Sequence, residues 1–305
     1  MQKAIQVNSS WKKGWFRAKE AMVAMNKDCT IYKDPSLKCT DLRSLILHEK
    51  MKKSVSWDLV RFKENVFLVD ANGNGHHKSL ETALKVNCIG KSRKGVSLLL
   101  QPGRYYLSFD SQVDLIGNWE PPKGSNAWPD EDSPIKLLPI TQPIFWLRSS
   151  DVLLARISVR EEATTAFMNG TIIRIQVDYR FKLLECSVRS NIQNVPAIDQ
   201  FCNTTVIIKK CRFYGGYHPI MTGGESMPGN MEEVSLNVED SIFSGSKVQA
   251  VEVHYGTKVV IKNSHFVGCG AQGLSASGTK RFESDQLCDN CSKNKSLDEG
   301  TLQLK

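Results

Sequence analysis

The chain has 305 residues and a formal net charge of +8, with Lys and Arg spread along its whole length. This mild and dispersed excess is poor support for nucleic acid as a partner, and we expect none. There is no run of about 18 apolar residues that would cross a membrane, and the first residues lack the apolar segment of a secretory signal. We therefore expect an intracellular, cytoplasmic protein without a membrane partner.

The first predicted element is a helix in residues 10–26, "SWKKGWFRAKEAMVAMN". Its apolar residues recur at spacings of three and four, as on one helix face: Trp15, Ala18, Met22 and Met25. The string resembles the first helix of a tetratricopeptide repeat, although Gly14 and Pro35 depart from that pattern. We assign residues 1–60 to a helical, tetratricopeptide-like end.

The tetratricopeptide resemblance implies a protein-binding role for two basic residues. In co-chaperones of this family a Lys and an Arg four residues apart grip the C-terminal carboxylate of a partner, and Lys13 and Arg17 match those positions. The i, i+4 spacing places both side chains on one helix face. The alternative interpretation is a solvated basic face on a single helix.

The next predicted elements form a cap and the first strands of a second domain. Leu68 to Asp70 is expected to be a short strand that ends in a Gly/Asn turn, and Ser79 is a good N-cap for a helix. In that helix Leu80, Ala83 and Leu84 form the apolar face. The segments "VSLLL", "RYYLSF" and "VDLIG" follow as strands. "GNGHH" lacks the spacing of a phosphate-binding loop, and His76 and His77 are expected to face solvent.

These motifs resemble the start of right-handed parallel β-helices of the pectin-lyase-like superfamily. In that family a "DxxGxGxxxSLxxAL" helix caps the first coil and an "hxhxPGxY" strand pair follows. The present pattern is most similar to the carbohydrate-binding and sugar-hydrolase β-helix domain that also occurs in F-box scaffold proteins. The resemblance covers residues 66–280 and implies a fold, but it implies almost nothing about chemistry.

A long insert, residues 117–136, carries four Pro, two Trp and four acidic residues. Long loops in compact domains are often functional. We predict Trp119 and Trp128 as candidate protein-binding anchors. The alternative is that both rings cover the end of the first coils.

A ten-residue pattern then recurs five times, starting at residues 152, 181, 206, 236 and 259. The last copies read "VIIKKCRFYG", "LNVEDSIFSG" and "VVIKNSHFVG". In these three copies positions one and three are apolar, position six is small, position eight is Phe and position ten is Gly, and the copies at 152 and 181 are looser. The polar pair at positions four and five predicts a corner between two short strands.

The recurrence predicts a solenoid, because one coil cannot bury its inward side chains alone and must stack on the next. The fold class is therefore mostly β, a right-handed parallel β-helix with an α-helical N-terminal segment. We expect Phe213, Phe243 and Phe266 to form one inward column. Cys186 and Cys211 share the small sixth position, which indicates packed, reduced thiols.

A few polar residues of neighbouring coils are candidates for a catalytic cluster. Asp199, Glu252 and His254 are the best candidates on neighbouring coils, with His218 expected on a nearby loop. None of them lies in a motif that resembles a pectinesterase, polygalacturonase or pectate lyase centre. Asp240 is interpreted as a solvated corner residue, and His265 as a surface residue. We expect no catalytic residues and no enzymatic activity.

The C-terminal segment, residues 281–305, is expected to be a polar tail that begins a zinc finger. Cys288 and Cys291 form a C-x-x-C pair, which is half of a tetrahedral zinc site. The spacing resembles the opening of a MYND-type finger that lacks its other two ligands here. A redox pair and an incidental pair are the alternatives.

Together these features predict a scaffold or adaptor for protein–protein interactions, built on a non-catalytic β-helix. The analogy with family architectures suggests partners in chaperone or ubiquitin pathways. The alternative function is a carbohydrate-active or carbohydrate-binding β-helix protein.

Overall fold

The computed structural model describes most of the chain between Cys39 and Leu297. The described ranges are 39–87, 95–107, 113–120, 133–139, 145–147, 151–160, 172–175, 180–190, 196–200, 204–222, 234–254, 257–270, 272–276, 281–284, 287–289 and 293–297. The chain divides into two units, Met1–Ser54 and Val55–Lys305. In the first unit the described element is the helix α3 (Cys39–Lys52).

The second unit begins with the predicted cap. A short 3₁₀ turn, η2 (Trp57–Leu59), precedes strand β1 (Val66–Val69), and helix α4 (Leu80–Asn87) follows. The Ser79 hydroxyl accepts a hydrogen bond from the Thr82 N–H at 3.2 Å, so Ser79 is the N-cap that the sequence predicts. The expected apolar face of α4 is buried in the core.

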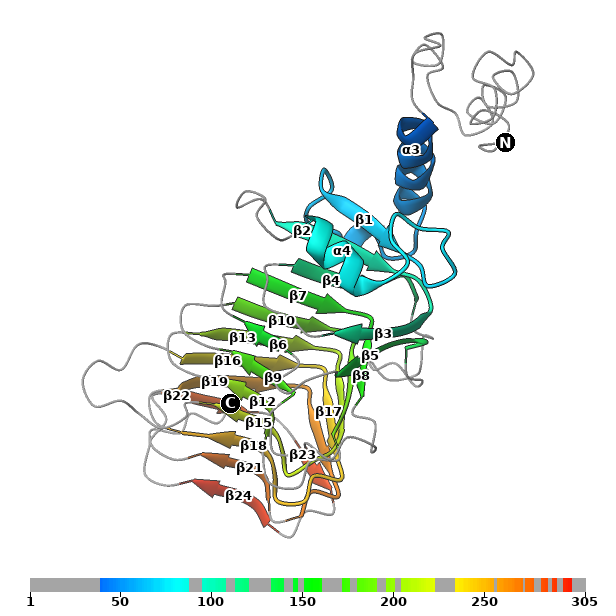
Figure 1. Ribbon diagram of the computed structural model, residues 1–305. Helices are drawn as coiled ribbons and strands as arrows, with labels where there is room; N and C mark the ends of the chain where they lie inside the picture. Colours follow the sequence, from blue (N-terminus) through cyan, green and yellow to red (C-terminus); the bar gives the residue numbers. More distant parts are fainter. Residues whose placement is uncertain are drawn as a thin grey trace. The chain divides into compact units, whose positions relative to one another are not determined.

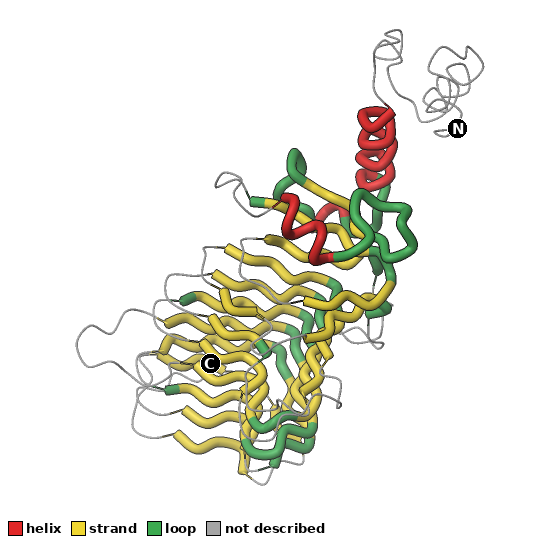
Figure 2. The backbone as a smooth tube through the Cα atoms, in the orientation of Figure 1, coloured by secondary structure: helices red, strands yellow, loops and turns green. Residues whose placement is uncertain are grey.

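The strands of this unit form three parallel sheets, which we name A, B and C. In the described part of the chain they contain nine, eight and seven strands. Figure 1 shows the strands of each sheet stacked one above another along the solenoid, and Figure 2 shows the strands and loops alternating along the chain.

Sheet A contains β1, β2 (Val96–Leu100), β4 (Val113–Gly117), β7 (Asp151–Ala155), β10 (Arg180–Leu184), β13 (Thr205–Lys209), β16 (Val234–Glu239), β19 (Thr257–Lys262) and β22 (Arg281–Ser284). Sheet B contains β3 (Gly103–Leu107), β5 (Ile135–Pro139), β8 (Ser158–Arg160), β11 (Ser187–Ser190), β14 (Arg212–Gly215), β17 (Ile242–Ser244), β20 (His265–Val267) and β23 (Leu287–Asp289). Sheet C contains β6 (Phe145–Leu147), β9 (Ile173–Ile175), β12 (Pro196–Gln200), β15 (His218–Thr222), β18 (Gln249–Val253), β21 (Gln272–Ala276) and β24 (Lys293–Leu297).

From β4 onward the chain passes through sheets A, B and C in turn, and each strand pairs in parallel with its counterparts in the neighbouring coils. This is the predicted parallel β-helix. The copies of the ten-residue pattern align in register, as in the pairing of Val206 with Leu236 and of Leu236 with Val259. The repeat therefore corresponds to one A-strand, one corner and one B-strand.

The corner between sheets A and B is the same in all five copies. Its fifth-position residue has a positive φ of between 47° and 55°: Arg156, Glu185, Lys210, Asp240 and Asn263. A non-glycine residue in this left-handed region costs about 1–2 kcal/mol. A ladder of hydrogen bonds offsets that cost. The Asp240 N–H, for example, donates to the carbonyl of Lys262 in the next coil at 3.0 Å.

The core confirms the predicted aromatic column. Phe213 and Phe243 stack with ring centroids 4.8 Å apart, and Phe243 and Phe266 with centroids 5.0 Å apart. All three rings are essentially inaccessible to solvent. Cys186, Cys211, Ser241 and Ser264 form the adjoining buried column of small residues, and both thiols are free.

Two boundaries lie elsewhere than expected. The second unit begins at Val55, and hydrogen bonds from Arg156 to the Val55 carbonyl and from Ser56 to the Gly117 carbonyl tie its first residues to the solenoid. At the other end, β22, β23 and β24 extend the three sheets past residue 280 to Leu297. The polar composition of this segment predicted a tail, but strands can stack on a preceding coil through backbone hydrogen bonds alone.

The two histidines of the cap are also placed differently from the expectation. His76 and His77 are half-buried, and the His76 Nδ1 accepts a hydrogen bond from the Leu68 N–H at 3.0 Å. The His76 ring also lies edge-on to Phe67. These residues complete the turn after β1, which is a structural role.

Candidate functional site

The outer face of sheet B is rich in basic and aromatic side chains. Residues on either side of the inward column must point outward, because strand side chains alternate between the two faces. The outward residues from β3 to β14 include five basic and two aromatic side chains: Arg104, Tyr106, Lys136, Arg160, Arg189, Arg212 and Tyr214. We call this set the basic face. The described outward positions of sheet B from β3 to β20 carry no acidic residue.

Register brings like charges together on the basic face. Arg104 lies directly opposite Lys136, and Arg160 lies directly opposite Arg189. Neighbouring strands are about 4.8 Å apart, and like charges in directly opposed positions are destabilising. Arg104 and Arg189 of these pairs are exposed at the surface.

Tyr214 holds two of the arginines in place. The Arg189 guanidinium lies over the Tyr214 ring, 4.5 Å from its centroid, and the Arg212 Nη1 donates a hydrogen bond to the Tyr214 hydroxyl at 3.2 Å. On the strand before them, the Arg160 Nε donates to the Ser158 hydroxyl at 3.2 Å. These contacts pre-organise planar groups that suit bidentate recognition of carboxylates.

The candidate catalytic residues lie on sheet C. Glu252 of β18 bridges two histidines: its Oε2 is 3.3 Å from the His218 Nε2, and its Oε1 is 3.4 Å from the His254 Nε2. His218 is the first residue of β15, so its expected position on a loop is wrong. Its ring is buried and lies edge-on to Tyr217.

The environment of His218 favours its neutral form. Burial lowers its pKa below the ordinary value, although the nearby Glu252 carboxylate opposes the shift. Its Nδ1 atom is buried and has no hydrogen-bond partner among the described residues. Glu252 also contacts His254, which is one-third exposed. This contact can orient His254 for proton transfer.

Asp199 does not join this cluster directly. Asp199, Met221 and Glu252 follow one another in register on β12, β15 and β18. The two carboxylate residues are thus two strand spacings apart, about 9.6 Å, with Met221 between them. Asp199 is also buried, with 3% of its surface exposed. The two residues therefore do not form an open pair of carboxylates of the kind that glycosidases use.

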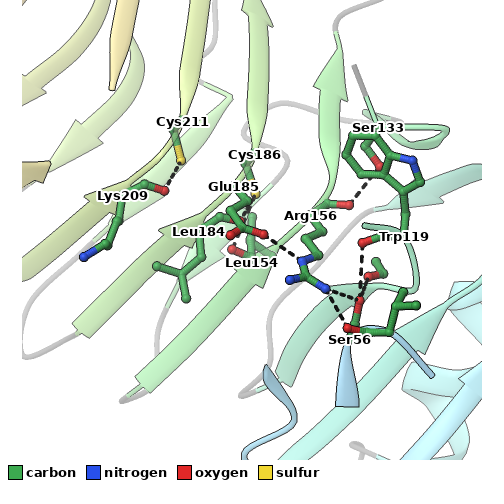
Figure 3. A network of polar contacts seen from close by, with 12 residues as sticks. Ser56, Trp119, Ser133, Leu154, Arg156, Leu184, Glu185, Cys186, Lys209 and Cys211 are labelled. Carbon is green, nitrogen blue, oxygen red and sulfur yellow. Dashed lines mark hydrogen bonds and ion pairs between the residues drawn. The ribbon is translucent and has the colours of Figure 1, made fainter. Parts of the chain in front are cut away.

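A separate polar network around Arg156 has a structural role (Figure 3). The Arg156 Nε donates to Glu185 at 2.7 Å, and its Nη1 donates to the Val55 carbonyl at 2.8 Å. Ser56 then donates to the Gly117 carbonyl at 2.6 Å. The network ties the first residues of the unit to a corner of the solenoid.

The predicted protein-binding residues are only partly described. Trp119 is half-buried and packs against the hydrophobic core, in agreement with the alternative that its ring covers the first coils. Trp128, Lys13 and Arg17 lie outside the described residues.

The predicted zinc ligands are also only partly described. Cys288 lies in β23 as the register partner of Phe266, whereas Cys291 falls in a range that the structure leaves out. The described residues contain no group of three or more His, Cys, Asp or Glu that could hold a metal ion. No helix among these residues is long and apolar enough to cross a membrane.

Sequence reasoning missed the basic face, although the repeat contains the signal for it. The eighth position points inward, so the seventh and ninth must point outward. The ninth position reads Arg160, Arg189 and Tyr214 in three successive copies, and Arg212 is a seventh-position residue. The shared positions of the repeat reflect packing, whereas the seventh and ninth positions vary from copy to copy and show no periodic signal.

Fold and sites together define a parallel β-helix solenoid with polar outer faces. No protein family profile matches the chain. A search of curated proteins also finds no match. Among solved structures it is similar to the pectin methylesterase from Aspergillus niger in deglycosylated form, with 12% identity and a TM-score of 0.41, over 78% of this chain and 90% of that one. A likeness at this level says nothing about the chemistry of the present chain.

Proposed function

We propose that this chain is a protein-interaction scaffold or adaptor, built on a non-catalytic β-helix, and that sheet B carries its binding surface. The observation that supports the proposal is the basic face, where Arg and Tyr side chains follow one another in register over several coils. Arg and Tyr are enriched at protein interfaces and among their energetic hot spots. A rigid sheet presents them without the cost of ordering a loop.

The proposal extends to the two ends of the chain. A tetratricopeptide-like N-terminal segment with Lys13 and Arg17 would add a second protein-binding element, and a zinc finger that begins at Cys288 and Cys291 a third. Such an architecture fits a cytoplasmic adaptor of chaperone or ubiquitin pathways. A chain that continues past Lys305 and supplies two more ligands should bind zinc that a chelator removes, whereas Cys288 and Cys291 alone should hold little. Metal analysis of both chains tests the zinc part.

Site-specific photo-crosslinking tests the scaffold function. A photoreactive amino acid at Tyr106, an outward residue with 54% of its surface exposed, should give discrete protein adducts in cells. The matched control places the same group at Asn237, on the outer face of sheet A. Equal labelling from both positions, or none from Tyr106, would contradict the proposed surface.

One observation supports the alternative function of a carbohydrate-active protein: the His218–Glu252–His254 cluster on sheet C. We expect no hydrolysis or elimination of pectin, polygalacturonate or related glycans by the purified protein. Turnover above background that disappears in Asp199→Ala or Glu252→Gln variants would replace the scaffold proposal with an enzymatic one.

A further inference from the structure

The second half of the basic face, on strands β8, β11 and β14, carries charged and aromatic side chains for which no ligand has yet been assigned. We propose that Arg160, Arg189, Arg212 and Tyr214 form an anion-binding site for the carboxylate side chains of an extended acidic protein segment. This inference rests on the proposed scaffold function and specifies the chemical class of the partner.

The charges of these strands favour an anionic ligand. Arg160 and Arg189 are directly opposed on neighbouring strands, and Arg212 follows on the next strand. A cluster of guanidinium groups attracts a carboxylate, because opposite charges attract at short range. The nearest described outward residues on β17 are Ile242 and Ser244, which supply no competing negative charge.

The geometry of the guanidinium groups suits a carboxylate. A guanidinium carries five N–H donors in a fixed plane, and it can satisfy contacts inside the chain and still receive a ligand. Arg160, Arg189 and Arg212 all make polar contacts within the fold, which holds them in defined orientations. The stacking of Arg189 on Tyr214 fixes the plane of its guanidinium, and a planar fork of N–H donors suits the two oxygens of a carboxylate.

The length of the basic face matches that of an extended segment. The basic face runs over five consecutive strands of sheet B, from β3 to β14. Four strand spacings amount to about 19 Å, which an extended segment of about six residues spans. Arg104 and Lys136 at the far end would meet the continuation of the same segment. A segment with several Asp or Glu residues is therefore the occupant that fits in charge and in reach.

The test uses the full chain and a fluorescent peptide of alternating Glu and Ala residues, with binding followed by anisotropy. We expect measurable binding that weakens as ionic strength rises, and no binding of the matching Gln–Ala peptide. An Arg160→Gln/Arg189→Gln variant should lose about tenfold or more in affinity, as expected for two charge-assisted contacts. Arg189→Lys should lose part of it, because a lysine keeps the charge and loses the fork.

The matched control removes the same charge from sheet A. A Lys182→Gln/Lys258→Gln variant alters two outward residues of β10 and β19 and should bind like wild type. An equal loss in this control would overturn the proposal in favour of non-specific attraction to a basic protein. Preferential binding of polygalacturonate over the Glu–Ala peptide would overturn it in favour of an acidic polysaccharide. If the peptide does not bind but crosslinks from Tyr106 persist, the acidic partner is wrong and the scaffold function stands.

Discussion

Along sheet B the inward side chains stay apolar and become larger, whereas the outward side chains lose their positive charge. Inward, the eighth repeat position holds Val159, Val188, Phe213, Phe243 and Phe266, all buried. Outward, the ninth position runs from arginine through tyrosine to serine and valine: Arg160, Arg189, Tyr214, Ser244 and Val267. Stacking requires an apolar inward side chain, because each one packs on its neighbours in the adjacent coils. The outward side chain is free of that constraint and can carry binding chemistry.

The largest expected effect comes from the inward column. Replacing Phe243 by Ala removes a fully buried ring that is stacked on both sides, and we expect a loss of about 4 kcal/mol in unfolding free energy. Chemical denaturation of wild type and variant measures it. The matched outward change is Ile242→Ala, on the residue directly before, which should cost about 1 kcal/mol because that side chain is half-exposed. Similar losses in both variants would contradict the comparison.

An outward residue that is covered should behave like an inward one. Asp114 of β4 lies between the core residues Val113 and Leu115, yet it is fully buried beneath Arg61. Arg61 binds it through two nitrogens, and the Leu153 N–H donates to its Oδ1 at 3.0 Å. Arg61→Met would leave a buried carboxylate without its cation, at a cost of about 3 kcal/mol.

A second substitution separates the charge from the packing. Asp114→Leu in the Arg61→Met background removes the unpaired charge, so the double variant should recover much of the lost stability. A double variant no more stable than Arg61→Met would mean that the contacts of Arg61, and not its charge, hold residues 55–65 on sheet A.

The corner residues offer a backbone test of smaller size. Asn263 has a φ of 47°, in the left-handed region, where a β-branched residue is strained. Asn263→Val should therefore cost about 1–2 kcal/mol, measured as a shift in the denaturation midpoint. Asn263→Gly is the control, because glycine removes the side chain without the strain and should stay close to wild type. Equal losses would assign the effect to the side chain of Asn263 instead.

These elements also show what the sequence could and could not reveal. The recurring Phe and the corner pairs predicted the coil register correctly, because packing repeats with the fold and leaves a periodic trace. Lys13, Arg17, Trp128 and Cys291 lie outside the described residues and stay predictions. The arginines of the basic face escaped notice because binding residues need not repeat. The sequence grouped His218 with Glu252 on neighbouring parts of the chain, but their direct contact depends on the register across coils of unequal length.

The last and smallest effect is a pH dependence at sheet C. Burial lowers the pKa of His218 below 6.5 in the folded chain, so between the lowered value and 6.5 only the unfolded chain holds the proton. Stability is therefore complete above about pH 7 and declines as the pH falls through 6.5, by less than about 1.4 kcal/mol per pH unit.

His218→Gln should remove this part of the decline, measured by urea unfolding between about pH 7.5 and 5. Glu252→Gln should steepen it, because the carboxylate is the group that favours the His218 imidazolium. A decline that is unchanged in His218→Gln and no steeper in Glu252→Gln would show that a lowered pKa of His218 does not contribute to it. In that case sheet C would lose its claim to any acid–base role.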